Sequence, residues 1–371
     1  MEDRLITVAI HTYDRAVELK SYLENEGIEV VLQNINLTTP IISSGVRVRI
    51  HESDLPKALR LIENVEIFTI HSSPSPSSPN SKIILVPVDF SEISLKACKV
   101  AFSIANSRKT EVMLLHSFVD PSMTASIQLS DNLDFDIEES EMLETIAKDA
   151  EKRMIELSED LRDKIKNGEL PPVKFSRKII EGLPEEAINE FSKEISPYLI
   201  VMGTRGKDKK ERELIGSVTA EVLDTCRSPI LTIAENSSLE SLKHIKSIVM
   251  FCTLDQRDLI ALDCLSKLYL DNCERVTLVV ISPKKPNQLN DNATQALFDY
   301  CRQHYPALHF ELKIFSMKNL VSEFNSLIEN QEVNLIVVPN KKKNAFARLF
   351  NPGIAHRLLF STDTPMIVLP V

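Results

Sequence analysis

Short aliphatic runs alternate with stretches of helical periodicity along most of the chain after residue 81. Each run is only a few residues long and nearly free of polar side chains, which is typical of parallel strands covered on both faces. The alternation of such strands with helices predicts a doubly wound parallel sheet with right-handed crossovers. Over residues 81–236 we expect its five strands at 82–86, 112–115, 173–180, 198–202 and 229–233.

The same pattern occurs a second time over residues 243–371. The two copies align near their ends without a gap, so that Pro229 falls on Pro365. This predicts a second five-stranded sheet. The strands of the second copy are expected at 247–252, 276–281, 310–315, 334–338 and 365–369.

Residues 1–70 have a different pattern of shorter, partly polar elements. Strands are expected at 5–10, 28–32 and 46–50, and the last alternates apolar and polar residues because one face is wet. A helix that Gly27 stops lies between the first two strands, and a second helix is expected from Leu55. These elements predict a small ferredoxin-like α+β domain. Residues 71–80 are rich in serine and proline, which indicates a linker.

The composition restricts the functional classes. A length of 371 residues suits two or three domains, and a net charge of −10 argues against a nucleic-acid partner. The start of the chain does not read as a signal peptide, and no apolar run is long enough to span a membrane. The 6 cysteines form no CxxC pair, so we expect reduced thiols in a cytoplasmic protein. His11 and His51 have no acidic or cysteine partner at ligand spacing, so no metal site is expected.

Glycine is rare in this chain, yet three glycines gather after one expected strand. Of the 8 glycines, Gly203, Gly206 and Gly216 lie between the strand at 198–202 and a helix that begins near Val218. Glycine lets a ligand approach the backbone closely. The first N–H groups of a helix have no intrahelical acceptor, and the helix dipole is positive there. This loop is therefore predicted to bind phosphate groups.

Ligands of doubly wound sheets bind at the carboxyl ends of the strands, near the switch point of the strand order. Three segments are expected to meet at that edge of the first sheet. Asp89 follows the first strand, His116 and Ser117 end the second, and the glycine loop follows the fourth. The sequence therefore predicts one ligand site in residues 81–236.

These segments are similar to the motifs of the universal stress protein family. The matching segments are VPVDFSE at 86–92, LLH at 114–116, GLP at 182–184 and the pattern Gly203-x2-Gly206-x9-Gly216-Ser217. They occur in the order found in the family and cover the whole of residues 81–236. The resemblance implies an adenine nucleotide alpha hydrolase-like fold and ATP binding, with ADP and AMP as alternative ligands and Mg²⁺ accompanying the nucleotide. In that family the fifth strand often pairs with that of a second copy, so the resemblance also implies that the strands at 229–233 and 365–370 pair as an intrachain pseudo-dimer; a homodimer is compatible with that arrangement.

The resemblance also implies roles for individual residues. Asp89 is expected to accept a hydrogen bond from the adenine amino group, and the backbone near Val88 and Ser117 to frame the base. The glycine loop would surround the ribose and phosphates, and the start of the next helix would donate to the phosphates. Lysines at 207, 209 and 210 are either γ-phosphate contacts or part of a solvated loop. The implied nucleotide-binding residues are Pro87, Val88, Asp89, Ser117, Met202, Gly203, Arg205, Gly206, Gly216, Ser217 and Val218.

The second copy has lost the residues of this site. Pro339 stands at the position of Gly203, Pro352 at that of Gly216, and Thr253 at that of Asp89. Proline has no N–H and a fixed φ, so this loop cannot surround phosphate in the same way. The run at 341–343 is three lysines, which we interpret as a solvated basic loop rather than an anion site. Residues 243–371 are therefore expected to serve structure and pairing.

Residues 1–70 resemble, in pattern, a small prokaryotic signal-transducing domain. The resemblance is carried by TVAI at 7–10, LENEGI at 23–28 and the stretch from Val46 to Ala58. That family has no catalytic residues to transfer to this chain.

The function favoured by the sequence is an ATP-binding protein of stress response or signalling, with one nucleotide per chain and an unknown signalling partner. One alternative is an interaction scaffold without a physiological nucleotide. The other is slow ATP hydrolysis, although no catalytic residue is predicted because no nucleophile stands beside a base. His116 lies near the expected pocket, where a structural role is favoured.

Overall fold

The computed structural model describes residues 5–11, 13–34, 46–54, 57–58, 61, 82–119, 136–204, 216–237, 242, 245–252, 254, 256–269, 273–282, 291–316, 320–340 and 362–370. The chain separates into two compact units. One contains residues 1–65 and 79–226, and the other contains residues 66–78 and 227–371.

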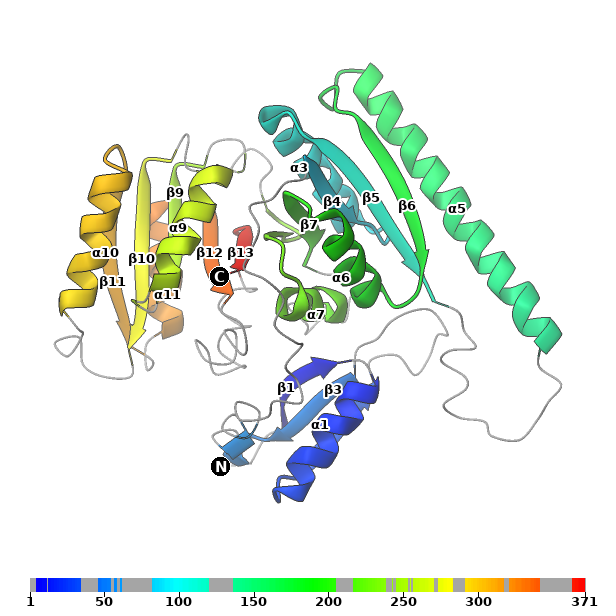
Figure 1. The fold of residues 1–371 in the computed structure, drawn as a ribbon, viewed down its shortest axis with the longest axis horizontal. Helices are drawn as coiled ribbons and strands as arrows, with labels where there is room; N and C mark the ends of the chain where they lie inside the picture. Colours follow the sequence, from blue (N-terminus) through cyan, green and yellow to red (C-terminus); the bar gives the residue numbers. More distant parts are fainter. Residues whose placement is uncertain are drawn as a thin grey trace. The chain divides into compact units, whose positions relative to one another are not determined.

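The described N-terminal residues form a small antiparallel sheet with a helix packed against it (Figure 1). The strands β1 (Leu5–His11), β2 (Val30–Asn34) and β3 (Val46–His51) lie in the order β1-β3-β2. Helix α1 (Tyr13–Asn25) is followed by Gly27 at φ 76, and the Gly27 N–H donates to the Glu24 oxygen at 2.9 Å. The α+β pattern expected here is present. Most of the helix expected from Leu55 and the linker at 71–80 lie outside the described residues.

The first large sheet is doubly wound, as the alternating pattern predicted. Its strands β4 (Ile83–Pro87), β5 (Glu111–Phe118), β6 (Phe175–Glu181) and β7 (Leu199–Gly203) lie in the order β7-β4-β5-β6 and are parallel. Every residue of β7 before Gly203 is buried, as expected of a strand covered on both faces. The helices of this part are α3 (Glu92–Arg108), α5 (Asp136–Lys166), α6 (Pro184–Ile195) and α7 (Ser217–Thr225).

The helices begin where the sequence places capping residues. The Ser91 side chain accepts from the Ser94 N–H at 3.2 Å, which confirms Ser91 as the N-cap of α3. Pro184 opens α6, where its missing N–H costs nothing. Gly182 precedes α6 at φ 140, a conformation that residues with a side chain rarely adopt. These caps direct the starts of α3 and α6 to the carboxyl edge of the sheet.

Helix α5 is the longest element, with 31 residues. Its buried apolar residues, Ala150, Met154, Leu157 and Leu161, form an i, i+4, i+7 stripe that faces the sheet. The helix lies beside β6 and extends past the end of that strand (Figure 1). Its Arg153 side chain reaches the carboxyl end of β4, because the guanidinium contacts Phe90 there.

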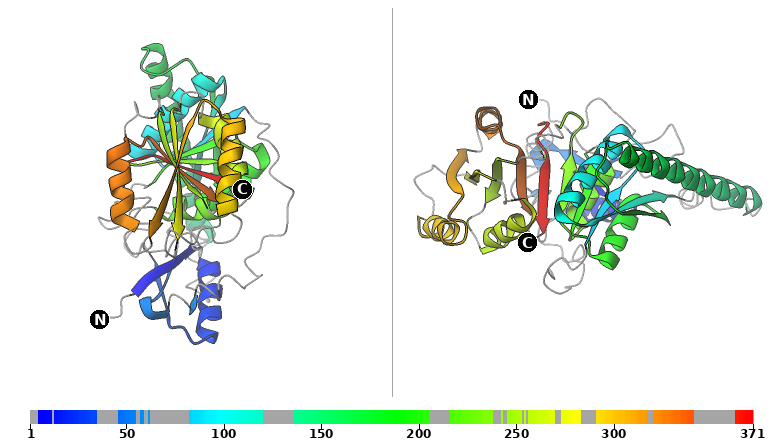
Figure 2. Two further views of the ribbon diagram at one scale, coloured as in Figure 1. Left: turned by 90° about the vertical axis from the view of Figure 1, so that its left-hand side faces the viewer. Right: turned by 90° about the horizontal axis from the view of Figure 1, so that it is seen from above.

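The second unit contains six described strands, referred to as the second sheet. They are β8 (Ile230–Ile233), β9 (Ser247–Cys252), β10 (Arg275–Ser282), β11 (His309–Ser316), β12 (Leu335–Asn340) and β13 (Met366–Pro370), in the order β11-β10-β9-β12-β13-β8. The helices are α9 (Gln256–Tyr269), α10 (Asp291–His304) and α11 (Leu320–Gln331). Figure 2 shows the strands of this sheet with helices beside them.

Strand β8 pairs antiparallel with β13, with Leu231 opposite Ile367. The other strands of this sheet are parallel to one another. The Thr232 Oγ1 donates to the Met366 oxygen at 3.2 Å, and the Ser237 Oγ donates to the Asp363 oxygen at 2.7 Å. The pairing expected between the last strands of the two sequence copies is therefore confirmed.

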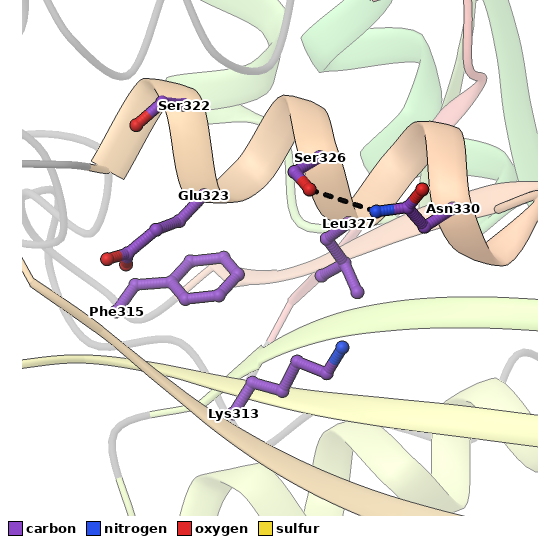
Figure 3. Close-up of a pocket in the computed structure, with 7 residues that line it drawn as sticks. All are labelled: Lys313, Phe315, Ser322, Glu323, Ser326, Leu327 and Asn330. Carbon is purple, nitrogen blue, oxygen red and sulfur yellow. Dashed lines mark hydrogen bonds between the residues drawn. The ribbon is translucent and has the colours of Figure 1, made fainter.

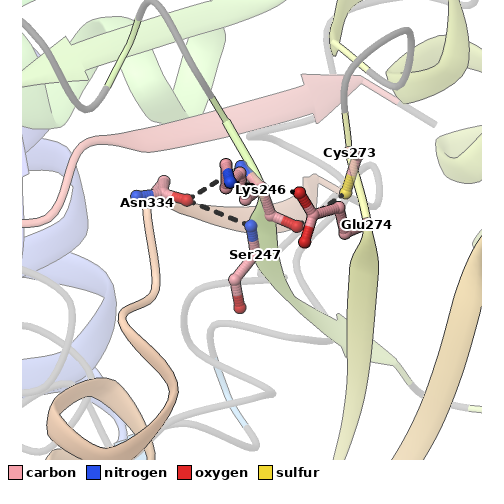
Figure 4. A network of polar contacts seen from close by, with 5 residues as sticks. All are labelled: Lys246, Ser247, Cys273, Glu274 and Asn334. Carbon is pink, nitrogen blue, oxygen red and sulfur yellow. Dashed lines mark hydrogen bonds and ion pairs between the residues drawn. The ribbon is translucent and has the colours of Figure 1, made fainter.

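A polar network joins the amino ends of β9, β10 and β12 (Figure 4). The Asn334 Oδ1 accepts from the N–H groups of Lys246 and Ser247 at 2.9 and 3.0 Å. The Lys246 oxygen accepts from the Glu274 N–H at 2.9 Å, and the Lys246 Nζ lies 3.2 Å from Glu274 Oε1. Both side chains of that ion pair are exposed, so the backbone bonds stabilise this edge more than the pair does.

The first sheet has the corresponding backbone bonds at its own amino edge. The Glu111 N–H donates to the Lys82 oxygen and the Tyr198 N–H to the Ile83 oxygen, each at 2.8 Å. Tyr198 thus occupies the place that Asn334 has in the second sheet. The two sheets share their backbone geometry at this edge, although the side chains differ.

Candidate functional site

Two hydrogen bonds join the carboxyl ends of β4 and β5. The Val88 N–H donates to the Leu115 oxygen at 2.8 Å, and His116 Nδ1 lies 2.7 Å from the Val88 oxygen. Because a carbonyl oxygen can only accept, Nδ1 of His116 carries the hydrogen. Val88 is 5% exposed, so these bonds fix a buried peptide at the predicted site. This hydrogen bond gives His116 the structural role that the sequence analysis favoured.

Asp89 has one carboxylate oxygen fixed within the chain. Its Oδ1 accepts from the Ser91 N–H at 3.0 Å and from the Ser91 Oγ at 2.6 Å. No hydrogen bond to Oδ2 is found among the described residues. The carboxylate is therefore oriented by Ser91, while Oδ2 can accept a hydrogen bond from a ligand.

Phe90, between these two residues, has an unusual backbone. Its φ is 61, in the left-handed region, which costs a residue with a side chain about 1–2 kcal/mol. The Phe90 ring lies 4.5 Å from the His116 ring, and the Arg153 guanidinium lies 4.2 Å from the centre of the Phe90 ring. A cation over an aromatic face contributes about 0.5–1 kcal/mol at an exposed site and more when desolvated. The two contacts therefore match the backbone strain in size.

Ser117 and Gly182 lie at the same edge of the sheet. Ser117 is 9% exposed and pairs with Ile180 of β6. The Gly182 N–H donates to the Phe118 oxygen at 2.8 Å, which closes the turn after β6. The motifs at the ends of β4, β5 and β6 are thus held together by backbone bonds.

The glycine loop is closed at its base by two hydrogen bonds. The Gly216 N–H donates to the Thr204 oxygen at 2.7 Å, and the Thr219 Oγ1 donates to the Gly203 oxygen at 2.9 Å. Met202, the residue before Gly203, is buried in β7. These bonds connect the end of β7 to the start of α7. The predicted site residues Arg205 and Gly206, and the lysines at 207, 209 and 210, lie outside the described residues.

Helix α7 begins without a side-chain cap. Its N-cap is Gly216, at φ −73 and ψ 153, and the first intrahelical bond runs from the Ala220 N–H to the Gly216 oxygen at 3.0 Å. The N–H groups of Ser217, Val218 and Thr219 therefore have no acceptor within the helix. The Gly216 N–H already donates to Thr204. Among the predicted site residues, Ser217 and Val218 therefore have the N–H groups that remain available to an anion.

A buried carboxyl lies where α6 and α7 pack together. Glu185 is 6% exposed, and its Oε2 has no hydrogen-bond partner within the described part of the chain. Burial raises the pKa of Glu185 to about 7, and the charge of Glu221, itself buried, acts in the same direction. Sequence analysis did not identify this group, because Glu185 is one of two adjacent glutamates at the start of a helix, where charged residues are common.

The second sheet has no equivalent of the phosphate loop among its described residues. Pro339 is a buried residue of β12 and pairs with Leu369 of β13. The positions of Thr253, Pro352 and the lysines at 341–343 lie outside the described residues. Where Gly203 ends β7, Pro339 is therefore followed by one further strand residue, Asn340.

A groove of about 330 Å³ lies between β11 and α11 in the second unit (Figure 3). Lys313 and Phe315 project from β11 toward Glu323 and Leu327 of α11. Its remaining lining residues, Ser322, Ser326 and Asn330, also come from α11. None of the predicted nucleotide-binding residues lines this groove.

The described residues contain no group of three or more His, Cys, Asp and Glu side chains that could hold a metal ion. Within the same residues, none of the helices has the length and apolar character required to cross a membrane. All six cysteines are free thiols, and five are buried. Burial raises the pKa of the Cys98 thiol to about 12, so this thiol is unreactive.

The strand order and the position of these residues define a doubly wound α/β protein with a candidate site at the carboxyl ends of β4, β5 and β7. A family model described as the universal stress protein family matches residues 80–234. A universal stress protein of Methanocaldococcus jannaschii is 32% identical over 152 residues, which are 41% of this chain and 81% of that protein. The chain belongs to the universal stress protein family.

Two further matches extend this comparison. A second universal stress protein of Methanocaldococcus jannaschii is 28% identical over 161 residues, covering 42% of this chain and 97% of that protein. The crystal structure of a universal stress protein from Archaeoglobus fulgidus covers 78% of this chain and 97% of its own, with a TM-score of 0.55 at 15% identity. The similarity of fold thus extends beyond residues 80–234, and the predicted adenine nucleotide alpha hydrolase-like fold is confirmed.

Proposed function

We propose that this chain is an ATP-binding universal stress protein with one nucleotide site, at the carboxyl edge of the first sheet. The observation that carries the proposal is that a hydrogen-bond acceptor and a set of hydrogen-bond donors, both available to a ligand, lie at that same edge. Asp89 presents Oδ2 as an acceptor, and the start of α7 presents N–H donors at Ser217 and Val218. An adenine amino group suits the acceptor, and phosphates suit the donors.

The base would lie beside Asp89, against Pro87 and the buried backbone of Val88 and Ser117. The carbonyl and N–H of Val88 are already bonded to β5, so this wall is preorganised before a ligand arrives. Preorganisation favours affinity because little of the site must be ordered on binding.

The phosphates would lie at the glycine loop. Gly203, Arg205, Gly206 and Gly216 are the loop residues assigned to the ribose and phosphates. Mg²⁺ would bind mainly through phosphate oxygens and water, as is usual for this ion. ADP and AMP share the adenine contact, so they are weaker alternatives that lack part of the phosphate contact.

We assign residues 243–371 to a degenerate second stress-protein domain that serves structure and pairing. The proline at 339 and the β8–β13 pairing support this assignment. We assign residues 1–70 to a signal-transducing module that would respond to occupancy of the site through an unidentified partner. Nucleotide binding would then regulate that partner in a stress response or a signalling pathway.

Titration calorimetry of the full chain with ATP and Mg²⁺ tests the proposal. We expect a stoichiometry of one and a dissociation constant in the micromolar range, about −8 kcal/mol. Asp89→Ala should weaken ATP binding roughly tenfold or more, since it removes a hydrogen bond to a charged acceptor. Folded protein that binds no adenine nucleotide would identify the chain as a scaffold instead. Steady release of ADP from ATP would identify it as an ATPase.

A further inference from the structure

We propose that Arg153 of α5 is a positioning residue of the nucleotide site and acts through Phe90 on Asp89. The inference rests on the proposed function, because it explains how the chain would select adenine. Arg153 lies outside every motif that marks the site in the sequence. The structure brings it to the site by placing its guanidinium 4.2 Å from the centre of the Phe90 ring.

The orientation of Asp89 depends on the backbone of Phe90. Phe90 stands between Asp89 and Ser91, and its φ of 61 turns the chain back. This turn lets the Ser91 N–H and Oγ reach Asp89 Oδ1 at 3.0 and 2.6 Å. If Phe90 returned to a negative φ, the peptide between residues 90 and 91 would rotate and the Ser91 N–H would leave Oδ1. Asp89 would then lose the bonds that aim its second oxygen.

Two ring contacts hold Phe90 in this conformation. The His116 ring is fixed from the sheet side, because its Nδ1 donates to the Val88 oxygen at 2.7 Å. The Arg153 guanidinium covers the ring from α5. Among the described residues, this guanidinium has no hydrogen bond or ion pair, so its main interaction is the stacking on the Phe90 ring. The strain and the contacts are similar in size, so removing either contact allows Phe90 to relax.

Helix α5 holds Arg153 in place. The neighbouring Ala150, Met154 and Leu157 are buried, so the helix is fixed by its apolar stripe. A positioning residue on such a helix keeps its place without bonds of its own.

The same helix provides a matched control. The Arg162 guanidinium lies 5.7 Å from the centre of the Phe175 ring, an interaction of the same type. Phe175 is the first residue of β6, at the opposite edge of the sheet from Asp89. Arg162→Gln therefore removes a similar contact without touching the site.

The test compares ATP with purine riboside triphosphate, which lacks only the exocyclic amino group. Calorimetry on the full chain should show that the wild type prefers ATP by about tenfold. We expect Arg153→Gln to reduce this preference roughly fivefold with little change for purine riboside triphosphate, and Arg153→Lys to restore part of it. Arg162→Gln should leave the preference unchanged.

The outcomes separate the two proposals. If the wild type binds ATP and Arg153→Gln keeps the full preference for ATP over purine riboside triphosphate, Arg153 is not a positioning residue. The proposed nucleotide site is then still supported. The same conclusion follows if Arg162→Gln causes an equal loss. If the wild type binds neither nucleotide, both the proposed function and this inference fail.

A fluorescence measurement gives a second, independent readout. The chain has 0 tryptophans, so Phe90→Trp introduces a single reporter at this position. Adding Arg153→Gln should shift the emission of this tryptophan to longer wavelength, because the indole is then more exposed to water. Identical emission with and without Arg153→Gln would show that the guanidinium does not hold the ring at position 90, which overturns the inference.

Discussion

The N–H of Gly216 donates to the carbonyl oxygen of Thr204 at 2.7 Å, which joins the start of α7 to the end of β7. This bond uses the one N–H that a glycine N-cap would otherwise offer to a ligand. It also brings the next two N–H groups to the carboxyl edge of the sheet. The donors proposed for phosphate are thus those of Ser217 and Val218.

Ser217→Pro should weaken ATP binding more than Ser217→Ala does. Ser217 is the first residue of α7, where proline is tolerated because its missing N–H has no intrahelical acceptor. Proline removes the N–H and the hydroxyl, whereas alanine removes only the hydroxyl. We expect a loss of about tenfold for proline and of about threefold for alanine, measured by calorimetry with ATP. Equal losses would mean that the Ser217 N–H does not contact phosphate.

Thr219→Val should loosen the base of the glycine loop. The buried Thr219 Oγ1 donates to the Gly203 oxygen at 2.9 Å, and valine keeps the shape without the donor. We expect the unfolding free energy to fall by about 1 kcal/mol and ATP affinity to fall severalfold. Thr225→Val is the control, because Thr225 makes a bond of 2.8 Å to the Glu221 oxygen in the last turn of the same helix. A loss of ATP affinity in both variants would rule out a specific effect on the loop.

Glu185 should make stability fall as pH rises. Its pKa is raised from 4.5 to about 7 in the folded protein, so the folded state binds more protons than the unfolded state between these values. The contribution is fully present below pH 4.5 and is lost as pH approaches about 7. Glu185→Gln removes the ionisation and should raise the unfolding free energy at pH 8 by up to about 3 kcal/mol.

Urea denaturation of the wild type and Glu185→Gln at pH 5 and pH 8 measures this difference. Glu186→Gln is the matched control, because Glu186 is exposed on the same turn of α6. A gain for Glu185→Gln that is the same at both pH values would show that ionisation of Glu185 is not its cause.

Asn334→Ala should destabilise the second sheet without affecting ATP binding. The Asn334 Oδ1 accepts two backbone N–H groups, from Lys246 and Ser247. Losing both bonds should cost about 2 kcal/mol of unfolding free energy, measured with urea. Asn330→Ala removes a single exposed bond to Ser326 and should change stability by less than about 0.5 kcal/mol. A marked loss of ATP affinity in Asn334→Ala would contradict a site confined to the first sheet.

The elements of this fold could be predicted because their signals are local. Aliphatic runs marked the strands of both large sheets, and Ser91, Pro184 and Gly27 marked helix ends through capping and backbone geometry. The pairing of β8 with β13 was expected from the family resemblance, which the two copies in one chain allow to form within the chain.

The parts of the site that escaped prediction depend on contacts between distant residues. Phe90 and Arg153 belong to a turn and to a helix far along the chain, and neither has a periodicity that indicates the other. The bond from Ser91 to Asp89 does have a local signal, because serine two residues after aspartate suits an Asx-type turn. The use of the Gly216 N–H by Thr204 depends on where the loop closes, which composition does not reveal.

The pairing of β8 with β13 joins two strands of a single chain, so it does not depend on protein concentration. Separate subunits that pair such strands come apart on dilution, whereas a covalent link keeps the effective concentration of the partner strand high. Strand β13 then needs only to present its edge to β8 for the pair to form. Under the proposed assignment this pairing does not require the second sheet to bind a ligand, which agrees with a proline at position 339, where the first sheet has Gly203.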